Sequence, residues 1–236
     1  MGYFPLFLDV TGQTCVVIGG GVVAERKVRS LMKAGAVVTV VSPSITEGLA
    51  KAVRSGTVRH IQRAYKHGDI RGYKLALVAT GETAVAAQAS AEANELGVPV
   101  NVADVPALSS FIAPAVVRRG ELQIAISTGG ASPALARALR QELEESFGVE
   151  FAALVEMLAA ARRYLRDHEP RFKVRADILA NLAGSAQLRQ YLKRGQRGDA
   201  EALVAQHLGV EIAQLNFDAS LPKASEATPV STVDSE

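Results

Sequence analysis

The chain has 236 residues, of which 48% are apolar and 21% charged, the composition of a globular protein rather than a disordered, collagen-like or disulfide-stapled chain. No apolar run approaches the ~18 residues of a membrane helix, and the amino terminus lacks a basic-then-apolar export signal, so no membrane partner is predicted. The net charge is +2, and it is unevenly spread along the chain.

Short β-branched runs alternate with helical segments over the first hundred residues. Near-continuous apolar strands separated by helices indicate a parallel sheet covered on both faces, and right-handed crossovers make it a doubly wound, Rossmann-like α/β domain. The single cysteine, Cys15, lies in the first run and cannot form an internal disulfide, which favours a cytoplasmic location. The predicted strands are Cys15–Ile18, Val37–Val41, Val58–Ile61, Leu75–Ala79 and Val98–Val102, and the predicted helices are Val22–Ala34, Ile45–Ser55 and Glu82–Leu96.

A glycine-rich turn follows the first predicted strand. It reads Gly19-Gly20-Gly21-Val22-Val23-Ala24, a G-x-G-x-x-A pattern that leads into a helix. Gly19 would permit the tight turn, Gly21 would let the backbone approach a pyrophosphate, and the small Ala24 would allow the helix to pack closely on the strand. The unpaired N–H groups and the positive dipole end at the start of the helix would face the phosphates. The pattern predicts a dinucleotide site, and the alternative is an ordinary glycine turn.

The ends of the second and fourth predicted strands would border the same crevice. The carboxylate that usually accepts the ribose hydroxyls about 20 residues after the glycines is missing, and Ser42-Pro43-Ser44 stands in its place. Ser42 or Ser44 would bond a ribose hydroxyl or cap the next helix. No Arg stands at this strand end to attract a 2′-phosphate, so NAD is predicted rather than NADP. Thr80-Gly81 would line the crevice or begin the third helix.

Asp104 ends the string Asn101-Val102-Ala103-Asp104, which includes the end of the fifth predicted strand. Open parallel sheets bind their ligands at the carboxyl ends of the strands. A carboxylate at this edge is suited to accepting a proton or holding a cation, or it caps a turn, and the residues leave both readings open.

The pattern changes after Asp104. Phe111–Val117 and Leu122–Ser127 are predicted strands joined by a turn at 118–121, and a helix is predicted over Pro133–Phe147. The string Ser127-Thr128-Gly129-Gly130-Ala131-Ser132-Pro133 places hydroxyls and free N–H groups at the start of that helix, an arrangement that binds anions. Ser132 as a plain helix cap is the alternative.

Helical periodicity dominates the remainder. The predicted helices are Glu150–Asp167, Phe172–Leu182, Ala186–Lys193 and Ala200–Leu208. Between residues 160 and 197 ten Lys and Arg stand against three Asp and Glu, but aromatic residues do not alternate with them, so no nucleic-acid partner is predicted. The histidines His60, His67, His168 and His207 lack metal-ligand spacing, and no metal site is predicted.

Five strings of the sequence, in order, carry a resemblance to a known family. The chain resembles the precorrin-2 dehydrogenase/sirohydrochlorin ferrochelatase family, the amino-terminal module of siroheme synthase, over about residues 1–215. The strings are Pro5-Leu6-Phe7-Leu8, Val17–Lys27, Asn101–Asp104, Phe111-Ile112-Ala113-Pro114 and Ser127–Arg137.

The resemblance implies an activity and an organisation. Members oxidise precorrin-2 to sirohydrochlorin with NAD⁺, and some then insert Fe²⁺ to give siroheme. They are homodimers that exchange a central segment, so both chains line each active site. The implied division is an NAD-binding domain over 1–113, a dimerisation segment (α+β) over 114–147, a helical domain over 148–215 and a tail over 216–236 that is expected to be disordered. Fused members continue into a methyltransferase domain, so methylation is expected of another protein.

The resemblance also implies roles for single residues. The catalytic aspartate of the family matches Asp104, and the NAD contacts match Val22-Val23 and Pro43-Ser44. The family's serine, phosphorylated in some members, falls at Thr128 beside Ser127, so phosphorylation is not carried over to this position. The substrate is a polycarboxylate, which makes the hydroxyls of Ser127 and Thr128 and nearby arginines expected substrate contacts. These arginines are Arg118, Arg119, Arg137 and Arg140.

Three functional hypotheses remain at this point. The first is an NAD-dependent precorrin-2 dehydrogenase, and the second adds ferrochelation, with Asp104 holding iron or taking pyrrole protons. The third is a dinucleotide-sensing regulatory module that binds the cofactor without turnover. The sensor hypothesis leaves the string at 127–133 without a purpose.

Overall fold

The computed structural model describes residues 2–217, so residues 218–236 of the predicted tail lie outside the described range. The chain divides into two structural units, each described by itself below. Within the described range, the amino-terminal unit comprises residues 2–113 together with Gly129–Ala131, and the carboxyl-terminal unit comprises Pro114–Thr128 and residues 132–217. No helix within residues 2–217 is both long and apolar enough to cross a bilayer.

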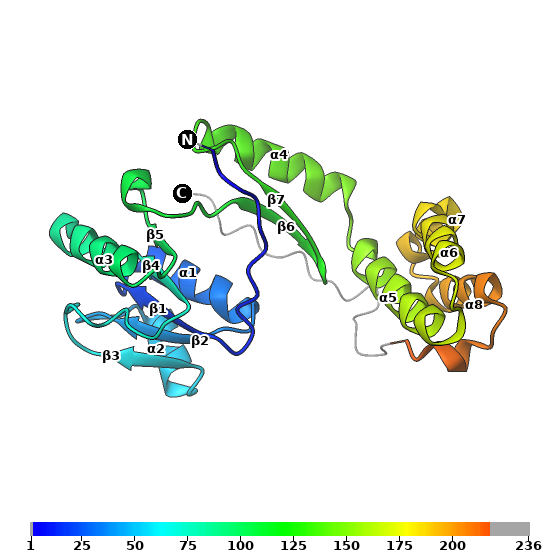
Figure 1. Ribbon diagram of the computed structural model, residues 1–236, viewed down its shortest axis with the longest axis horizontal. Coiled ribbons are helices and arrows are strands. Elements are labelled where there is room, and N and C mark those ends of the chain that lie inside the picture. Colours follow the sequence, from blue (N-terminus) through cyan, green and yellow to red (C-terminus); the bar gives the residue numbers. More distant parts are fainter. Residues whose placement is uncertain (1, 218–236) are drawn as a thin grey trace. The chain divides into compact units, whose positions relative to one another are not determined.

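The amino-terminal unit is built on a five-stranded parallel sheet (Figure 1). The strand order is β3-β2-β1-β4-β5, with Ile18 of the central strand level with Val41 on one side and Val78 on the other. This confirms the predicted Rossmann-like fold. The strands are β1 (Thr14–Ile18), β2 (Val37–Val41), β3 (Val58–Ile61), β4 (Leu75–Val78) and β5 (Val100–Val102), and the helices are α1 (Val22–Lys33), α2 (Glu47–Arg54), α3 (Thr83–Glu95) and the short 3₁₀ helix η1 (Pro106–Leu108).

Alternate residues of β1 enter two separate cores, because successive side chains of a strand point to opposite faces. Cys15 and Val17 pack with α1 and α2, whereas Val16 and Ile18 pack with α3. Both faces of the sheet are therefore covered, which explains why the strands are apolar throughout.

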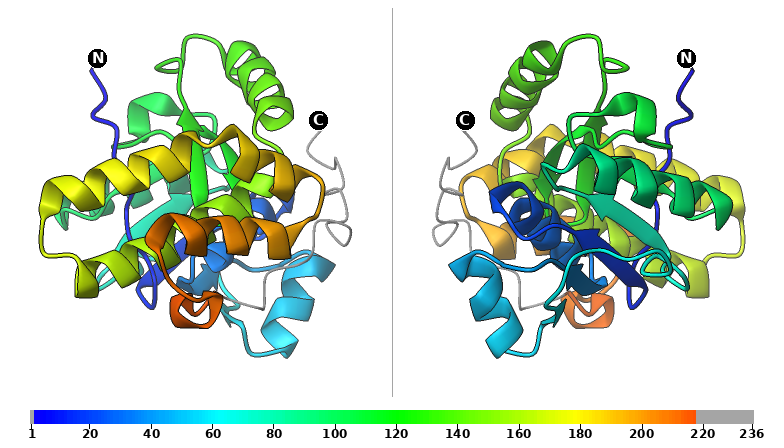
Figure 2. Two further views of the ribbon diagram at one scale, coloured as in Figure 1. Left: turned by 90° about the vertical axis from the view of Figure 1, so that its right-hand side faces the viewer. Right: turned by 90° about the vertical axis from the view of Figure 1, so that its left-hand side faces the viewer.

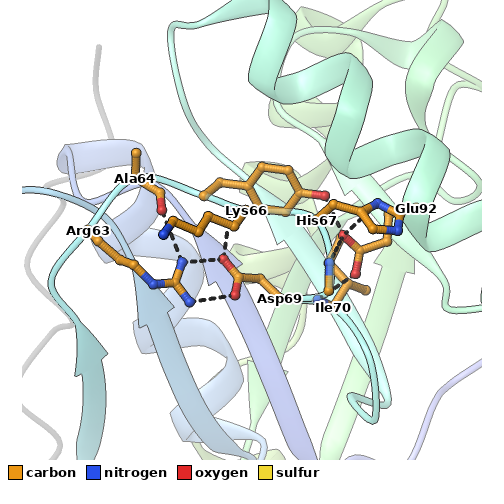
Figure 3. Close-up of polar contacts among 9 residues, drawn as sticks. Arg63, Ala64, Lys66, His67, Asp69, Ile70 and Glu92 are labelled. Carbon is orange, nitrogen blue, oxygen red and sulfur yellow. Dashed lines mark hydrogen bonds and ion pairs between the residues drawn. The ribbon is translucent and has the colours of Figure 1, made fainter.

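The connection from β3 to β4 contains no helix and is held by two carboxylates (Figure 3). Asp69 accepts two hydrogen bonds from the Arg63 guanidinium at 2.6 and 2.7 Å. Glu92 of α3, only 2% exposed, accepts the backbone N–H groups of Gly68 and Ile70, each at 2.9 Å, and the Tyr65 hydroxyl. These hydrogen bonds offset the cost of burying the Glu92 carboxyl group, and they fix the connection on α3.

The carboxyl-terminal unit begins with a β-hairpin of β6 (Ala115–Arg119) and β7 (Leu122–Ile126), followed by α4 (Pro133–Ser146). The prediction of a strand from Phe111 is wrong, since Phe111 packs against the core of the amino-terminal unit. The prediction of a four-residue turn is also wrong, because Arg118 and Arg119 pair within β6. A two-residue turn suffices because Gly120 adopts a left-handed φ of 57°.

Helices α5 (Glu150–His168), α6 (Phe172–Gly184), α7 (Ala186–Lys193) and α8 (Arg197–Leu208) form a small bundle with the 3₁₀ helix η2 (Ile212–Leu215), as Figure 2 shows. Met157 and Leu182 are fully buried at its centre. α8 starts at Arg197, three residues before the predicted start, and the Arg197 guanidinium pairs with Glu156 of α5 and Glu201 of α8. These ion pairs stabilise the first turn of α8 against α5.

Candidate functional site at the carboxyl edge of the sheet

Four strand ends meet at one edge of the amino-terminal unit. The hydrogen-bond ladder continues past the strands, with Gly19 N–H donating to Val41 O at 2.9 Å and Ala79 N–H to Ile18 O at 2.8 Å. Ala103 N–H donates in turn to Val78 O at 2.8 Å. The structure therefore brings the segments predicted for the cofactor to the same sheet edge as the segment that carries Asp104.

Gly19 and Gly20 are required by the close approach of neighbouring backbone. Gly19 has a φ of +120°, and a Cβ there would lie 2.2 Å from the Ala79 carbonyl oxygen. A Cβ on Gly20 would lie 1.9 Å from the Ser44 carbonyl oxygen. The turn after β1 is thus held between the ends of β4 and β2. Gly20 was not among the residues expected to matter.

Gly21 differs from its two neighbours because nothing lies within 4 Å of a Cβ built there. Gly21 is the N-cap of α1 and offers no side chain to the first N–H groups of the helix, which have no acceptors within it. Val22 is 78% exposed and Val23 37% exposed in the next two positions. Open space in front of unsatisfied N–H groups at the positive end of a helix fits a pyrophosphate.

The end of β2 presents Pro43 and Ser44 to solvent, whereas Ser42 is buried. The Ser42 hydroxyl donates to the Ser44 carbonyl at 2.7 Å, so it shapes the loop. The alternative that Ser42 or Ser44 caps α2 is wrong, because Thr46 is the N-cap and its hydroxyl accepts Leu49 N–H at 3.3 Å. Thr46 N–H also donates to Gly20 O at 3.0 Å, which ties this loop to the glycine turn.

Thr80-Gly81 follows β4 at the same edge. The Thr80 hydroxyl accepts Glu82 N–H at 3.2 Å just before α3 begins. Gly81 is exposed, with nothing within 4 Å of a Cβ built there. Thr80 therefore organises the start of α3, and Gly81 keeps this side of the edge open.

Asp104 stands two residues after β5 in a left-handed conformation, with a φ of 61°. Non-glycine residues rarely adopt this conformation, and Asp and Asn are among those that tolerate it best. The Asp104 side chain is exposed, and within residues 2–217 its carboxylate makes no hydrogen bond. An ionisable group held at a backbone outlier beside a predicted cofactor site is a candidate for chemistry.

Two polar residues that contact each other, Lys27 and Asn101, were not among the predicted site residues. Lys27 Nζ donates to Asn101 Oδ1 at 2.7 Å, and Asn101 Nδ2 donates to the Phe111 carbonyl at 3.1 Å. The helical spacing of the sequence could have pointed to Lys27. Lys27 lies in the stripe of α1 whose other members, Ala24, Val28 and Leu31, are buried in the core.

The Ser127–Pro133 string lies partly in each unit, and its turn is held by local hydrogen bonds. The Thr128 hydroxyl donates to Ser132 O at 3.1 Å and accepts Ser132 N–H at 3.0 Å, closing the turn. Ser132 caps α4, with its Oγ accepting Leu135 N–H at 3.2 Å. Ser127 is exposed at the end of β7. The Thr128 hydroxyl is thus engaged in the turn, whereas the substrate role expected of Ser127 and Thr128 stays a prediction.

The four arginines expected to meet substrate carboxylates fall into two pairs. Arg119 donates to the carbonyls of Phe147 and Glu144 at the end of α4, and Arg140 pairs with Glu144. Arg118 and Arg137 are exposed, and within residues 2–217 neither guanidinium forms an ion pair. Arg118 and Arg137 therefore stay available for an anionic ligand, whereas Arg119 and Arg140 hold α4.

Two further observations concern metal ligands and cavities. Among residues 2–217, no group of three or more His, Cys, Asp and Glu is placed to hold a metal ion. A shallow hollow of about 350 Å³ lies near the start of β1, lined in part by Gln13, Tyr73 and Lys74. It lies at the amino ends of the strands, the edge opposite to Gly21 and Asp104.

Comparison with known proteins gives consistent matches. A family model described as "Putative NAD(P)-binding" matches residues 6–115, and one described as "Sirohaem biosynthesis protein central" matches residues 119–146. Siroheme synthase of Pseudomonas aeruginosa is 36% identical over 215 residues, covering 91% of this chain and 46% of the relative. Siroheme synthase of Azotobacter vinelandii is 37% identical over 204 residues, which cover 86% of this chain and 44% of that relative. The chain thus spans less than half the length of these relatives.

A solved structure described as "SirC, precorrin-2 dehydrogenase" resembles this fold with a TM-score of 0.69. The match covers 86% of this chain and 100% of that one at 23% sequence identity. At this identity the likeness concerns the fold. It extends beyond the parallel sheet, since the sheet unit by itself is about half of the chain.

Proposed function

Because this chain belongs to the family of siroheme synthase amino-terminal modules, in which an NAD(P)-binding domain precedes a sirohaem central segment, we propose that it is an NAD-dependent precorrin-2 dehydrogenase. The observation that carries the proposal is the meeting of two features at one sheet edge. The open turn at Gly21 fits a dinucleotide pyrophosphate, and Asp104 presents an exposed carboxylate after β5. A regulatory sensor would need the first feature only.

The chemistry divides between cofactor and protein. When bound, NAD⁺ supplies the acceptor for the hydride that leaves precorrin-2. The backbone N–H groups after Gly21 hold the pyrophosphate, and exposed Val22 and Pro43-Ser44 contact the rest of the dinucleotide. Asp104 accepts the proton that the macrocycle loses, so the products are sirohydrochlorin, NADH and a protonated carboxyl that returns its proton to water.

The proposed cofactor is NAD rather than NADP. The loop that follows β2 carries Ser42-Pro43-Ser44 and no Arg or Lys, so nothing there would pair with a 2′-phosphate. Ser44 is exposed at the place where ribose hydroxyls are bound in such folds. Titrating the protein with NAD⁺ and NADP⁺ tests the choice, and tighter binding of NADP⁺ would overturn it.

We also propose that the chain acts as a homodimer through residues 114–147. This segment has almost no core of its own, because Val117 is its single buried residue and α4 has none. A two-stranded sheet is marginally stable without further cover. In this arrangement the carboxylates of the tetrapyrrole are bound by Ser127, Thr128, Arg118 and Arg137. Residues 148–215 form the helical domain that follows the dimerisation segment in the chain.

Ferrochelation is a second candidate activity, because the Asp104 carboxylate has no hydrogen-bonding partner within residues 2–217. The same carboxylate would take the pyrrole protons that Fe²⁺ displaces from sirohydrochlorin. Iron would then be a substrate of the reaction.

The deciding experiment incubates the purified protein with precorrin-2 and NAD⁺ without oxygen. We expect the visible spectrum of sirohydrochlorin and the absorbance of NADH to rise together in equal amounts. Fe²⁺ is then added in a second step, and conversion to siroheme reports chelation. Binding of NADH without any turnover of precorrin-2 would refute the dehydrogenase and favour the sensor hypothesis.

A further inference from the structure

Lys27 joins the helix of the proposed cofactor site to the segment that carries Asp104. It lies on α1, six residues after Gly21, and its Nζ donates to the Oδ1 of Asn101 at 2.7 Å. Asn101 is only 9% exposed and belongs to β5, three residues before Asp104. One hydrogen bond therefore connects α1 to β5 through two residues that are 74 positions apart in the sequence.

A half-buried lysine at position 27 lowers the stability of the folded state. Lys27 is half-buried in the stripe that packs α1 on the sheet, and within residues 2–217 it forms no ion pair. Burial lowers the pKa of its ammonium and Arg26 lowers it further, while Asp104 raises it. Burying an ammonium without an ion-pair partner costs free energy that Met or Leu would not cost. A role in packing does not explain the residue.

The charged groups that act on Lys27 come from α1 and from the segment after β5. Arg26 lies on α1 itself, and Asp104 follows β5. Asn101 cannot titrate, and it also holds the Phe111 carbonyl at 3.1 Å. The Lys27 ammonium therefore contacts Asn101, three residues before the left-handed Asp104.

We propose that Lys27 is a positioning residue of the dehydrogenase, which holds Asn101 and thereby the Asp104 carboxylate in line with the cofactor bound at the start of α1. The inference rests on the proposed function. A misplaced proton acceptor lowers turnover rather than cofactor affinity.

The first test compares Lys27→Met, Lys27→Arg and a control, Lys33→Met, at an exposed position in the last turn of α1. For Lys27→Met we expect kcat to fall roughly 10- to 100-fold, with the NAD⁺ dissociation constant within about twofold of the original. Lys27→Arg should recover most of kcat, and Lys33→Met should retain it. An unchanged kcat in folded Lys27→Met would overturn the inference.

The pH profile distinguishes positioning by charge from packing alone. Because the pKa of Lys27 is lowered, its ammonium loses its proton at a lower pH than an ordinary lysine does. The kcat of the unaltered protein should decline as that proton is lost, and Lys27→Arg should extend activity to higher pH. Coincident alkaline limbs in the two proteins would contradict a role for the charge.

A readout without turnover completes the test. Lysines of the protein are reductively methylated with ¹³C-labelled reagent, and the Lys27 signal is identified by its absence from Lys27→Met. Asp104→Asn should lower the Lys27 pKa, because the carboxylate raises it. An unmoved pKa would separate Lys27 from Asp104 and refute the proposal. Loss of precorrin-2 oxidation in the unaltered protein would instead refute the proposed function.

Discussion

At the scale of single residues, the three glycines after β1 differ in what a side chain would meet. Gly21 has an extended conformation, with φ −80° and ψ −173°, and open space beyond it. Gly21→Asp should therefore fold normally yet lower NAD⁺ affinity roughly 100-fold or more, because like charges placed together cost several kcal/mol. Calorimetric titration of the folded variant measures the loss.

The contrast with Gly20 serves as the control. Gly20→Ala would bring a Cβ to 1.9 Å from the Ser44 carbonyl, so it should lower stability together with affinity. Undiminished NAD⁺ binding by Gly21→Asp would mean that the pyrophosphate lies elsewhere.

Asp104 permits a similarly clean substitution because asparagine also tolerates a left-handed φ. Asp104→Asn should retain NAD⁺ binding and lower precorrin-2 oxidation by about 10²–10⁴-fold, the usual contribution of a general base. The variant is assayed for oxidation and for Fe²⁺ insertion. Near-normal oxidation with loss of chelation alone would assign Asp104 to the metal step and remove it as the base.

At the scale of elements, the β3–β4 connection depends on the charge of Asp69. Hydrogen bonds from Arg63 and from Lys66 N–H lower the pKa of Asp69. Since the folded pKa lies below the unfolded value of about 3.9, this stabilisation is present above that value and is lost as the pH falls through the folded pKa. Asp69→Asn should cost about 1–2 kcal/mol of unfolding free energy at pH 7, since Arg63 is partly exposed.

Urea unfolding followed by far-ultraviolet circular dichroism at several pH values checks this expectation. The stability difference between Asp69→Asn and the unaltered protein should begin to shrink below about pH 4 and vanish only below the lowered pKa of folded Asp69. A difference that is the same at every pH would show that the Asp69 carboxylate acts by its shape rather than by its charge.

At the scale of the whole molecule, the central segment 114–147 predicts self-association. Leu135 of α4 is 50% exposed, so a single chain leaves this apolar side chain uncovered. Light scattering at micromolar concentration should give the mass of a dimer. Leu135→Asp should shift the protein towards the monomer with little effect on the fold of a single chain, whereas Phe172→Asp, at an exposed position outside the segment, should not. A monomeric starting protein would refute the shared-site proposal.

The sequence by itself was enough to predict the parallel sheet, the glycine turn and the place of Asp104 at the carboxyl edge of the sheet. Alternation of apolar strands with helices predicts a parallel sheet, and in such a sheet every strand ends at the same edge. Residues that follow different strands, such as Gly21 and Asp104, must then share that edge, whatever the details of packing. Local spacing carries this information, so no tertiary contact had to be known.

Only the tertiary structure decided which polar groups are engaged and which are open. Arg119 and Arg118 are neighbours in the sequence, yet the first holds the end of α4 and the second is exposed. Phe111 packs against the core of the amino-terminal unit, and β6 begins only at Ala115. The contact of Lys27 with Asn101 joins residues 74 positions apart. Such contacts arise from packing between distant segments, which the periodicity of a single segment does not encode.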